Sequence, residues 1–152
     1  MTSDRLNNIL ARQESASEEK RKREERYAAD QAEAAVRKNK VSLLWREQKS
    51  ILLLVIDEIN SLMKKNGVQL SHHTPTKSVI DTESMVIYFS DDDHHTRDMK
   101  RLAISVSDNG RIYINMGTRS LVPAKEFNFD IDDTSKEIWE NTIIDFLDIN
   151  TP

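Results

Sequence analysis

Cysteine is absent from this chain of 152 residues. Its absence excludes disulfide bonds, thiolate metal sites and cysteine nucleophiles. It is consistent with a reducing compartment, so we expect a cytoplasmic protein. The first eight residues contain no apolar segment, and we therefore expect no secretory signal.

Glycine and proline are scarce, with three of each, and neither occurs before Gly67. The glycines Gly67, Gly110 and Gly117 fit no phosphate-binding loop or dinucleotide-binding pattern. A Gly-x-Ser-x-Gly nucleophile elbow is also missing. Carboxylates are abundant, but no two of them are singled out for acid–base work. These absences favour a non-enzymatic protein without a cofactor.

Long apolar runs are missing as well, because the longest uninterrupted one covers only residues 51–56. A membrane-spanning helix needs about 20 apolar residues, so no membrane association is expected. This run lies within the most apolar stretch of the chain, residues 43–63, whose spacing predicts a buried helix. Its predicted apolar face is formed by Leu44, Ile51, Val55, Ile59 and Leu62, widened by Trp45, Leu52, Ile56 and Met63.

The chain before this stretch is charged and alanine-rich, and nothing in it breaks a helix. We predict a short helix over residues 4–13 and a long one from about 17 to 66. Ser15 and Glu18 have the spacing of a capping box for the second helix, and Asn66-Gly67 ends it. The heptad pattern of a coiled coil is weak in this segment. When the alanines are placed at the core positions of a heptad repeat, Asn39 or Arg46 also falls at a core position. We therefore expect residues 1–40 to form a charged helical arm. Two alternatives stay open for part of it, namely disorder and a coiled coil.

After Gly67 the pattern changes to a period of two, which is typical of strands. Alternation predicts four strands near residues 85–89, 102–106, 112–116 and 127–131, and residues 68–78 are a loop with room for a short edge strand. A three-residue turn, Asp108-Asn109-Gly110, aligns Val106 with Ile112 and keeps both on the buried face. That turn requires Gly110 at a positive φ.

A final helix is predicted over residues 135–148, with Thr134 or Asp133 as its cap. Both helices and one face of the sheet are apolar, so they cover one another best in two layers. The expected fold is α+β: a long N-terminal helix, a four- to five-stranded antiparallel meander, and a C-terminal helix on the same sheet face. We divide the chain into the arm, 1–40, and a domain, 41–152. The apolar stripe of the final helix consists of Ile138, Trp139, Ile143, Phe146 and Leu147, with Ile144 and Ile149 at its margins.

The most conspicuous cluster of metal-ligand residue types is Asp91-Asp92-Asp93-His94-His95, with Asp98 beyond it. Carboxylates and imidazoles bind divalent metals, and His72-His73 forms a second pair. Neighbouring loop residues point in different directions, however, and a solvated turn explains the aspartates. We therefore assign no metal site and keep a metal-dependent enzyme as a distant alternative.

A basic cluster, Lys20, Arg21, Lys22, Arg23 and Arg26, lies within the arm. Clustered cations can follow phosphates, which gives the alternative of an accessory nucleic-acid-binding protein. Glutamates at 18, 19, 24 and 25 flank the cluster, so a self-paired helix surface is favoured.

The outer sheet face is a third candidate, a mildly apolar patch at positions 86, 88, 103, 105, 113 and 115. The function we predict is a protein-interaction module that self-associates as a homodimer through the helix around residues 36–62, with binding of another protein partner as the alternative.

Overall fold

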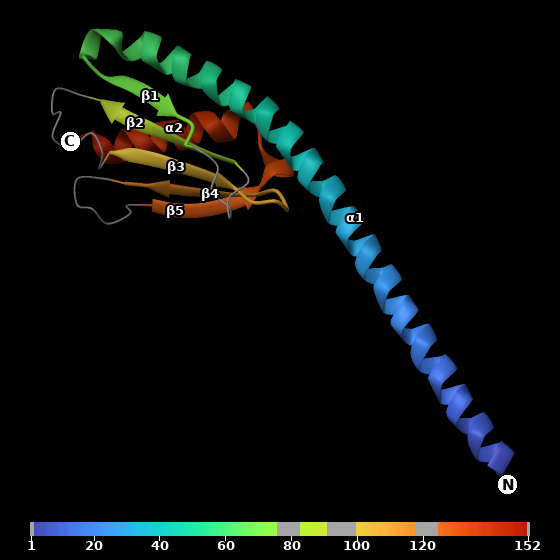
Figure 1. The fold of residues 1–152 in the computed structure, drawn as a ribbon. Helices are drawn as coiled ribbons and strands as arrows, with labels where there is room; N and C mark the ends of the chain where they lie inside the picture. The colour runs from blue at the N-terminus through green and yellow to red at the C-terminus, as the bar shows by residue number, and fades with distance from the viewer. Residues whose placement is uncertain (1, 76–82, 91–99, 118–124, 152) are drawn as a thin grey trace. The chain divides into compact units, whose positions relative to one another are not determined.

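The first element is a single helix, α1, that runs over the 62 residues Thr2–Met63. The computed structural model describes residues 2–75, 83–90, 100–117 and 125–151. The chain forms two compact units, Met1–Val36 and Arg37–Pro152. The second unit contains the last part of α1, a five-stranded sheet and a C-terminal helix, α2, over Lys136–Asn150 (Figure 1).

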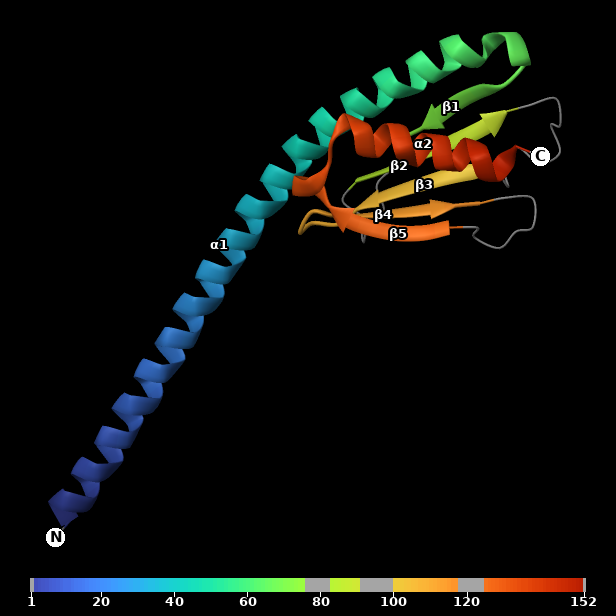
Figure 2. The ribbon, with the colours of Figure 1, turned by 180° about the vertical axis from the view of Figure 1, so that it is seen from behind.

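The five strands are antiparallel and follow one another in sequence order across the sheet. Their bounds are β1 Gln69–His73, β2 Glu83–Ser90, β3 Arg101–Val106, β4 Arg111–Met116 and β5 Lys125–Asp130. The predicted α+β meander is therefore confirmed, with β1 as its additional edge strand. Figures 1 and 2 show α2 across one sheet face and the last turns of α1 alongside β1.

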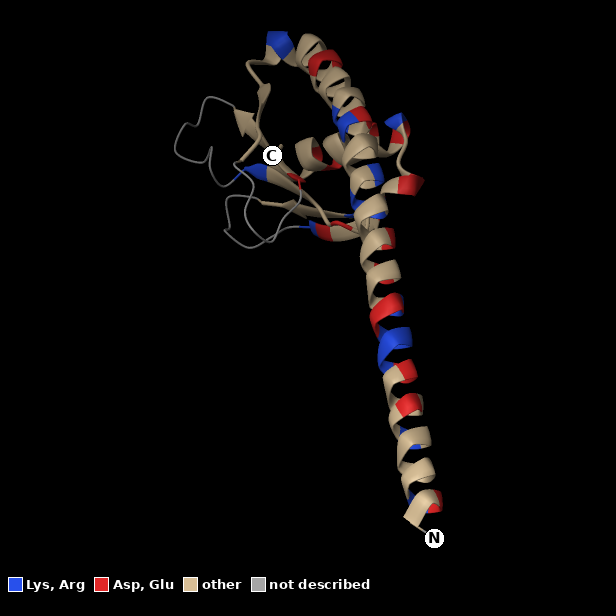
Figure 3. Cartoon of the chain, turned by 45° about the vertical axis from the view of Figure 1, so that its right-hand side comes forward, with Lys and Arg blue, Asp and Glu red and all other residues tan. Residues whose placement is uncertain are grey.

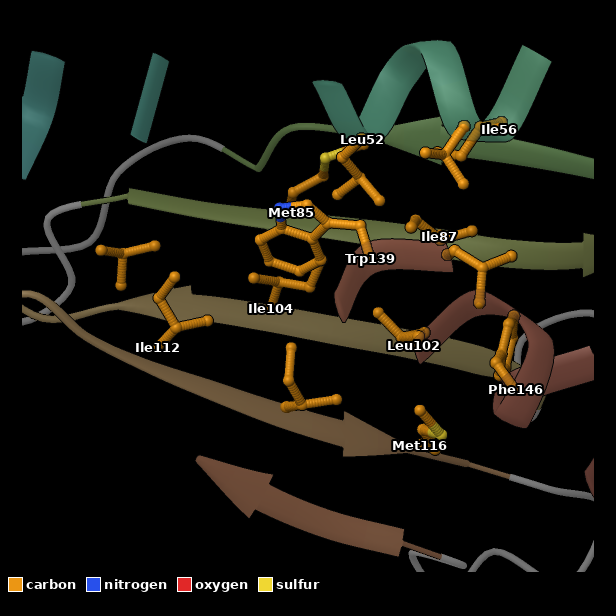
Figure 4. Close-up of a cluster of buried hydrophobic side chains, with 14 of the residues drawn as sticks. Leu52, Ile56, Met85, Ile87, Leu102, Ile104, Ile112, Met116, Trp139 and Phe146 are labelled. Atoms are coloured by element: carbon orange, nitrogen blue, oxygen red, sulfur yellow. The ribbon is translucent and has the colours of Figure 1, made fainter. Parts of the chain in front are cut away.

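Period-two alternation places one side of every central strand in the core. The buried residues are Met85, Ile87, Phe89, Leu102, Ile104, Val106, Ile112, Ile114 and Met116. The helices complete the same cluster, to which α1 contributes Leu52 and Ile56 and α2 contributes Trp139 and Phe146 (Figure 4). Each fully buried large side chain contributes about 1.5–3 kcal/mol, so this single core accounts for the association of the two helices with the sheet.

The two tryptophans join the helices inside this core. Trp45 and Trp139 are 3% and 0% exposed, and their rings meet edge-on with centroids 6.2 Å apart. The Trp139 indole donates a hydrogen bond to Gln48 Oε1 at 2.9 Å, which satisfies the one polar group of a buried indole. The prediction that both tryptophans belong to the core is confirmed.

The hairpin between β3 and β4 has the predicted register, with Val106 opposite Ile112 and Ile104 opposite Ile114. Its turn closes through a hydrogen bond from Gly110 N to Ser107 O at 3.0 Å. Gly110 has a φ of 94°, a conformation that costs a side-chain-bearing residue energy. The three-residue turn is therefore confirmed.

Two predictions about helix ends are wrong. The helices expected over 4–13 and from 17 are one continuous helix, because strong helix formers around Ser15 outweigh its capping preference. The cap of α2 is Ser135, whose hydroxyl accepts from Ile138 N at 3.3 Å. Thr134 instead ends a short 3-10 helix, Ile131–Asp133. At the other predicted boundary, Gly67 is left-handed as expected, with a φ of 71°.

The buried arc of α1 is also rotated from the predicted one. Its buried residues are Val41, Trp45, Leu52, Val55 and Ile56. Leu62, predicted on the apolar face, is 82% exposed. The α-helical period alone could not orient a segment that is apolar on all sides.

Replacement of Gly110 by valine is expected to destabilise the second unit by roughly 2–4 kcal/mol. A Cβ at this position would lie 2.9 Å from Ile131 Cγ2 and 3.2 Å from Val41 Cγ2, at a φ of 94°. Asn109→Ala is the matched control and should cost about 1 kcal/mol, because it loses only turn hydrogen bonds. Urea titration measures both values, and equal losses would contradict this role of Gly110.

Candidate interaction surfaces

One side of α1 in the second unit faces away from the core and carries two exposed leucines. Leu43 is 64% exposed and Leu54 is 60% exposed. They are eleven residues apart, which is close to three helical turns, so both lie on the same face. The core residues of α1, such as Trp45 and Leu52, occupy the opposite face. Large apolar side chains are therefore left at the surface of a helix whose inner side is already fully packed.

Four polar residues complete this outward row, and all of them are exposed. Together we name the row the outer ladder, which consists of Lys40, Leu43, Glu47, Ser50, Leu54 and Asp57. Lys40 and Asp57, at its two ends, form no ion pair with any described residue. The neighbouring Glu58, by contrast, is paired with Lys136 of α2 at 3.2 Å. The outer ladder thus combines two exposed leucines with two terminal charges of opposite sign.

The edge of the sheet at β1 is occupied by a side chain of α1. Asn60 Nδ2 donates to Leu70 O at 2.9 Å, and Leu70 N donates to Asn60 Oδ1 at 2.7 Å. The side-chain amide therefore pairs with this residue as a further strand would. At Leu70 the outward backbone groups of the edge strand are thereby satisfied, so this residue offers no template to another chain.

The opposite edge, at β5, carries a charge on its inner face. Lys125 Nζ lies 2.7 Å from Asp145 Oδ2 of α2 and 5.4 Å from the centroid of the Phe127 ring. Phe127 and Phe129, which pair with the buried Ile114 and Ile112, are themselves only partly buried. An inward-pointing charge on an edge strand opposes the addition of a further strand. Each sheet edge thus carries one feature that opposes strand addition, at Leu70 in β1 and at Lys125 in β5.

The first unit, Met1–Val36, contains all of the arm except its last four residues, and every described residue from Thr2 to Val36 is exposed. Two residues of its basic cluster, Arg21 and Lys22, pair with glutamates on the same helix. The Arg21 guanidinium lies 4.0 Å from the carboxylate of Glu18 and 3.8 Å from that of Glu25. The Lys22 ammonium lies 3.7 Å from the Glu18 carboxylate. Figure 3 shows acidic and basic segments following each other along this part of α1. The cluster is thus partly neutralised by its own helix.

The apolar residues of the arm gather near its start. Leu6, Ile9 and Leu10 are 55%, 42% and 46% exposed, and their spacing places them on one helical face. Between Gln13 and Val36, the positions that continue this face are polar, charged or alanine apart from Tyr27. The apolar row therefore does not continue as a heptad seam.

The histidine candidates for a metal site are not brought together among the described residues. His72 and His73 are consecutive in β1 and exposed, so they lie on opposite faces of the strand. The residues that the structure describes contain no group of three or more potential ligands. Asp91, Asp92, Asp93, His94, His95 and Asp98 lie outside the described residues.

A buried lysine is the group that sequence reasoning missed. Lys100 is 1% exposed, and its ammonium lies 5.2 Å from the centroid of the Phe89 ring, in cation–π geometry. It precedes Leu102 by two residues, so strand alternation could have assigned it to the inner face. Such burial makes the amine inaccessible to a dissolved substrate, and we therefore assign it a structural role.

A surface cleft of 540 Å³ lies beside the turn between α1 and β1. Its charged groups are Asp57 and Lys64, while the amide of Asn60 is already bonded to Leu70. Small-molecule sites of this size are mostly apolar with a few convergent polar groups. The cleft has no such arrangement, and we assign no ligand to it.

The predicted patch on the outer sheet face is smaller than expected. Val86, Tyr88, Ala103 and Ser105 are half-buried, which leaves Tyr113, 49% exposed, and Asn115 at the surface. A single tyrosine is an ordinary surface feature. This face therefore carries one exposed large apolar side chain, against two in the outer ladder.

Comparison of the chain with protein-family models, curated proteins and solved structures finds no match. Within the described parts of the chain, no helix has an apolar segment of the length and hydropathy that crossing a bilayer requires.

Replacement of Asn60 by alanine is expected to cost about 1–2 kcal/mol of stability, because it removes both hydrogen bonds to Leu70. It should also speed hydrogen exchange at the Leu70 amide, which loses its acceptor. Gln69→Ala, at an exposed neighbouring site, is the control and should change both values little. Unchanged exchange in Asn60→Ala would show that the side chain does not close the edge.

Proposed function

We propose that this protein is a non-catalytic interaction module that self-associates through the exposed face of α1 between Arg37 and Met63. The observation that supports this function most is the exposure of Leu43 and Leu54 on a helix whose other side is packed in the core. Removing such side chains from water favours association. The partner we propose is a second copy of the chain.

The remaining surfaces support this choice by contrast. Asn60 occupies one sheet edge, and Lys125 places a charge at the other. The cationic residues Arg21 and Lys22 are partly neutralised by glutamates on the same helix. Association through a strand edge or through nucleic-acid phosphates is thus less favoured than association through the helix face.

Substitution of both leucines by glutamate is expected to raise the dissociation constant of the dimer at least about tenfold, which corresponds to 1.4 kcal/mol. The substitution places charge in an apolar contact, where desolvation opposes binding. An interface formed by one helix face is small, and we expect its affinity to be low. Light scattering coupled to size exclusion should therefore cover protein concentrations from micromolar to millimolar.

Leu62→Glu is the matched control, because Leu62 is 82% exposed on the same helix but outside the outer ladder. It should leave the dissociation constant unchanged. A wild-type chain that stays monomeric over the whole concentration range would refute self-association, and equal effects of the two changes would refute the assigned face.

Binding to nucleic acid is expected to be weak and nonspecific. A random DNA duplex should be retained only at low salt, because acids surround the basic cluster. Fluorescence anisotropy at several salt concentrations measures this. Tight, salt-dependent binding that is lost when residues 20–23 are replaced by glutamine would instead favour the nucleic-acid-binding alternative.

A further inference from the structure

The spacing of the outer ladder along α1 is symmetric about its centre. Its six residues are separated by three, four, three, four and three positions along α1. Steps of three and four keep residues on one helical face. A row with symmetric spacing can be laid against a second copy of itself in the opposite direction, with every position matched by another. This is the condition for an isologous contact around a two-fold axis.

The chemistry of the row is complementary in that antiparallel arrangement. Reversal about its centre places Leu43 opposite Leu54 of the second copy, and Lys40 opposite Asp57 of that copy. Each contact occurs twice because of the two-fold axis. The central positions match Glu47 with Ser50, so no pair of like charges is created. A parallel arrangement would instead bring Lys40 against Lys40 and Asp57 against Asp57, which is repulsive.

The two charges are available for such pairing. Neither Lys40 nor Asp57 has an ion-pair partner among the described residues, whereas Glu58 is engaged by Lys136. The core contacts of α1 lie on the face opposite the outer ladder. Two copies can therefore approach through these faces with the two sheets on the outer sides.

We propose that the second units of two chains associate as an antiparallel helix pair, in which Leu43 packs on Leu54 of the other copy and Lys40 pairs with Asp57. This inference rests on the proposed self-association and adds the direction and register of the contact. The occupant of the exposed helix face is a second copy because the charges at the two ends of the face complement each other only when one copy is reversed.

The absence of cysteine from the chain allows a direct test by cross-linking. Three variants are needed: Leu43→Cys, Leu54→Cys and the double variant. A disulfide requires Cα atoms about 4.4–6.8 Å apart, whereas positions 43 and 54 of one helix are separated by about 16 Å. In an antiparallel pair, mild oxidation should therefore cross-link the double variant and an equimolar mixture of the single variants. Each single variant alone should remain uncross-linked.

Cross-linking of each single variant with itself would overturn the antiparallel register, while self-association as such would stand. A chain that sediments as a monomer before oxidation would refute the proposed function together with this inference. Circular dichroism of each variant confirms that the helix is retained.

Charge reversal provides a second measurement that leaves the leucines in place. Lys40→Glu and Asp57→Lys should each raise the dissociation constant about fivefold or more, and their combination should restore it to within about twofold. Both single effects should decrease at high salt. Additive losses in the double variant would show that the two residues do not face each other across the interface.

Discussion

The attachment of one side of α1 to the sheet is the contact on which the second unit depends. Trp45, Leu52 and Ile56 bring this helix into the same core as the strands and α2. The helix has so many apolar residues between 51 and 56 that its side chains cannot all reach that core. Burial of one arc therefore decides which apolar residues remain outside, and Leu54 is the one in this run that stays exposed. The exposed face of α1 that we propose for self-association is therefore a consequence of the way the core is built.

Much of the fold could be predicted from local pattern. Alternation located the strands, and the need to keep Val106 and Ile112 on one face determined the register at Gly110. The orientation of α1 could not be obtained in this way, because a nearly all-apolar helix has no strong amphipathic direction. For that reason Leu62 was placed on the wrong side. The candidate surface needed the structure, since exposure of Leu43 and Leu54 depends on the arc that the sheet covers.

The hydrogen bonds between the Asn60 side chain and the backbone of β1 could not be predicted from the sequence either. Nothing about Asn60 in the sequence indicates that its amide will pair with Leu70, because the approach of α1 to β1 depends on the whole core. Lys100 is a different case. Its position two residues before Leu102 is consistent with the buried face of the strand, but its charge argued against burial. A lysine that alternates with the buried residues of a strand can therefore be predicted on the inner face when an aromatic neighbour is present to contact its aliphatic chain and its charge.

The edge-to-face contact between Trp45 and Trp139 has a spectroscopic consequence. The chain contains two tryptophans, one from each helix, and both are shielded from water in the core. Their emission therefore reports the joining of α1 to α2, with no background from indoles elsewhere. Separation of the helices exposes both rings at once, so the wavelength of intrinsic fluorescence follows the integrity of the core, while the arm, which has no tryptophan, remains silent to this probe.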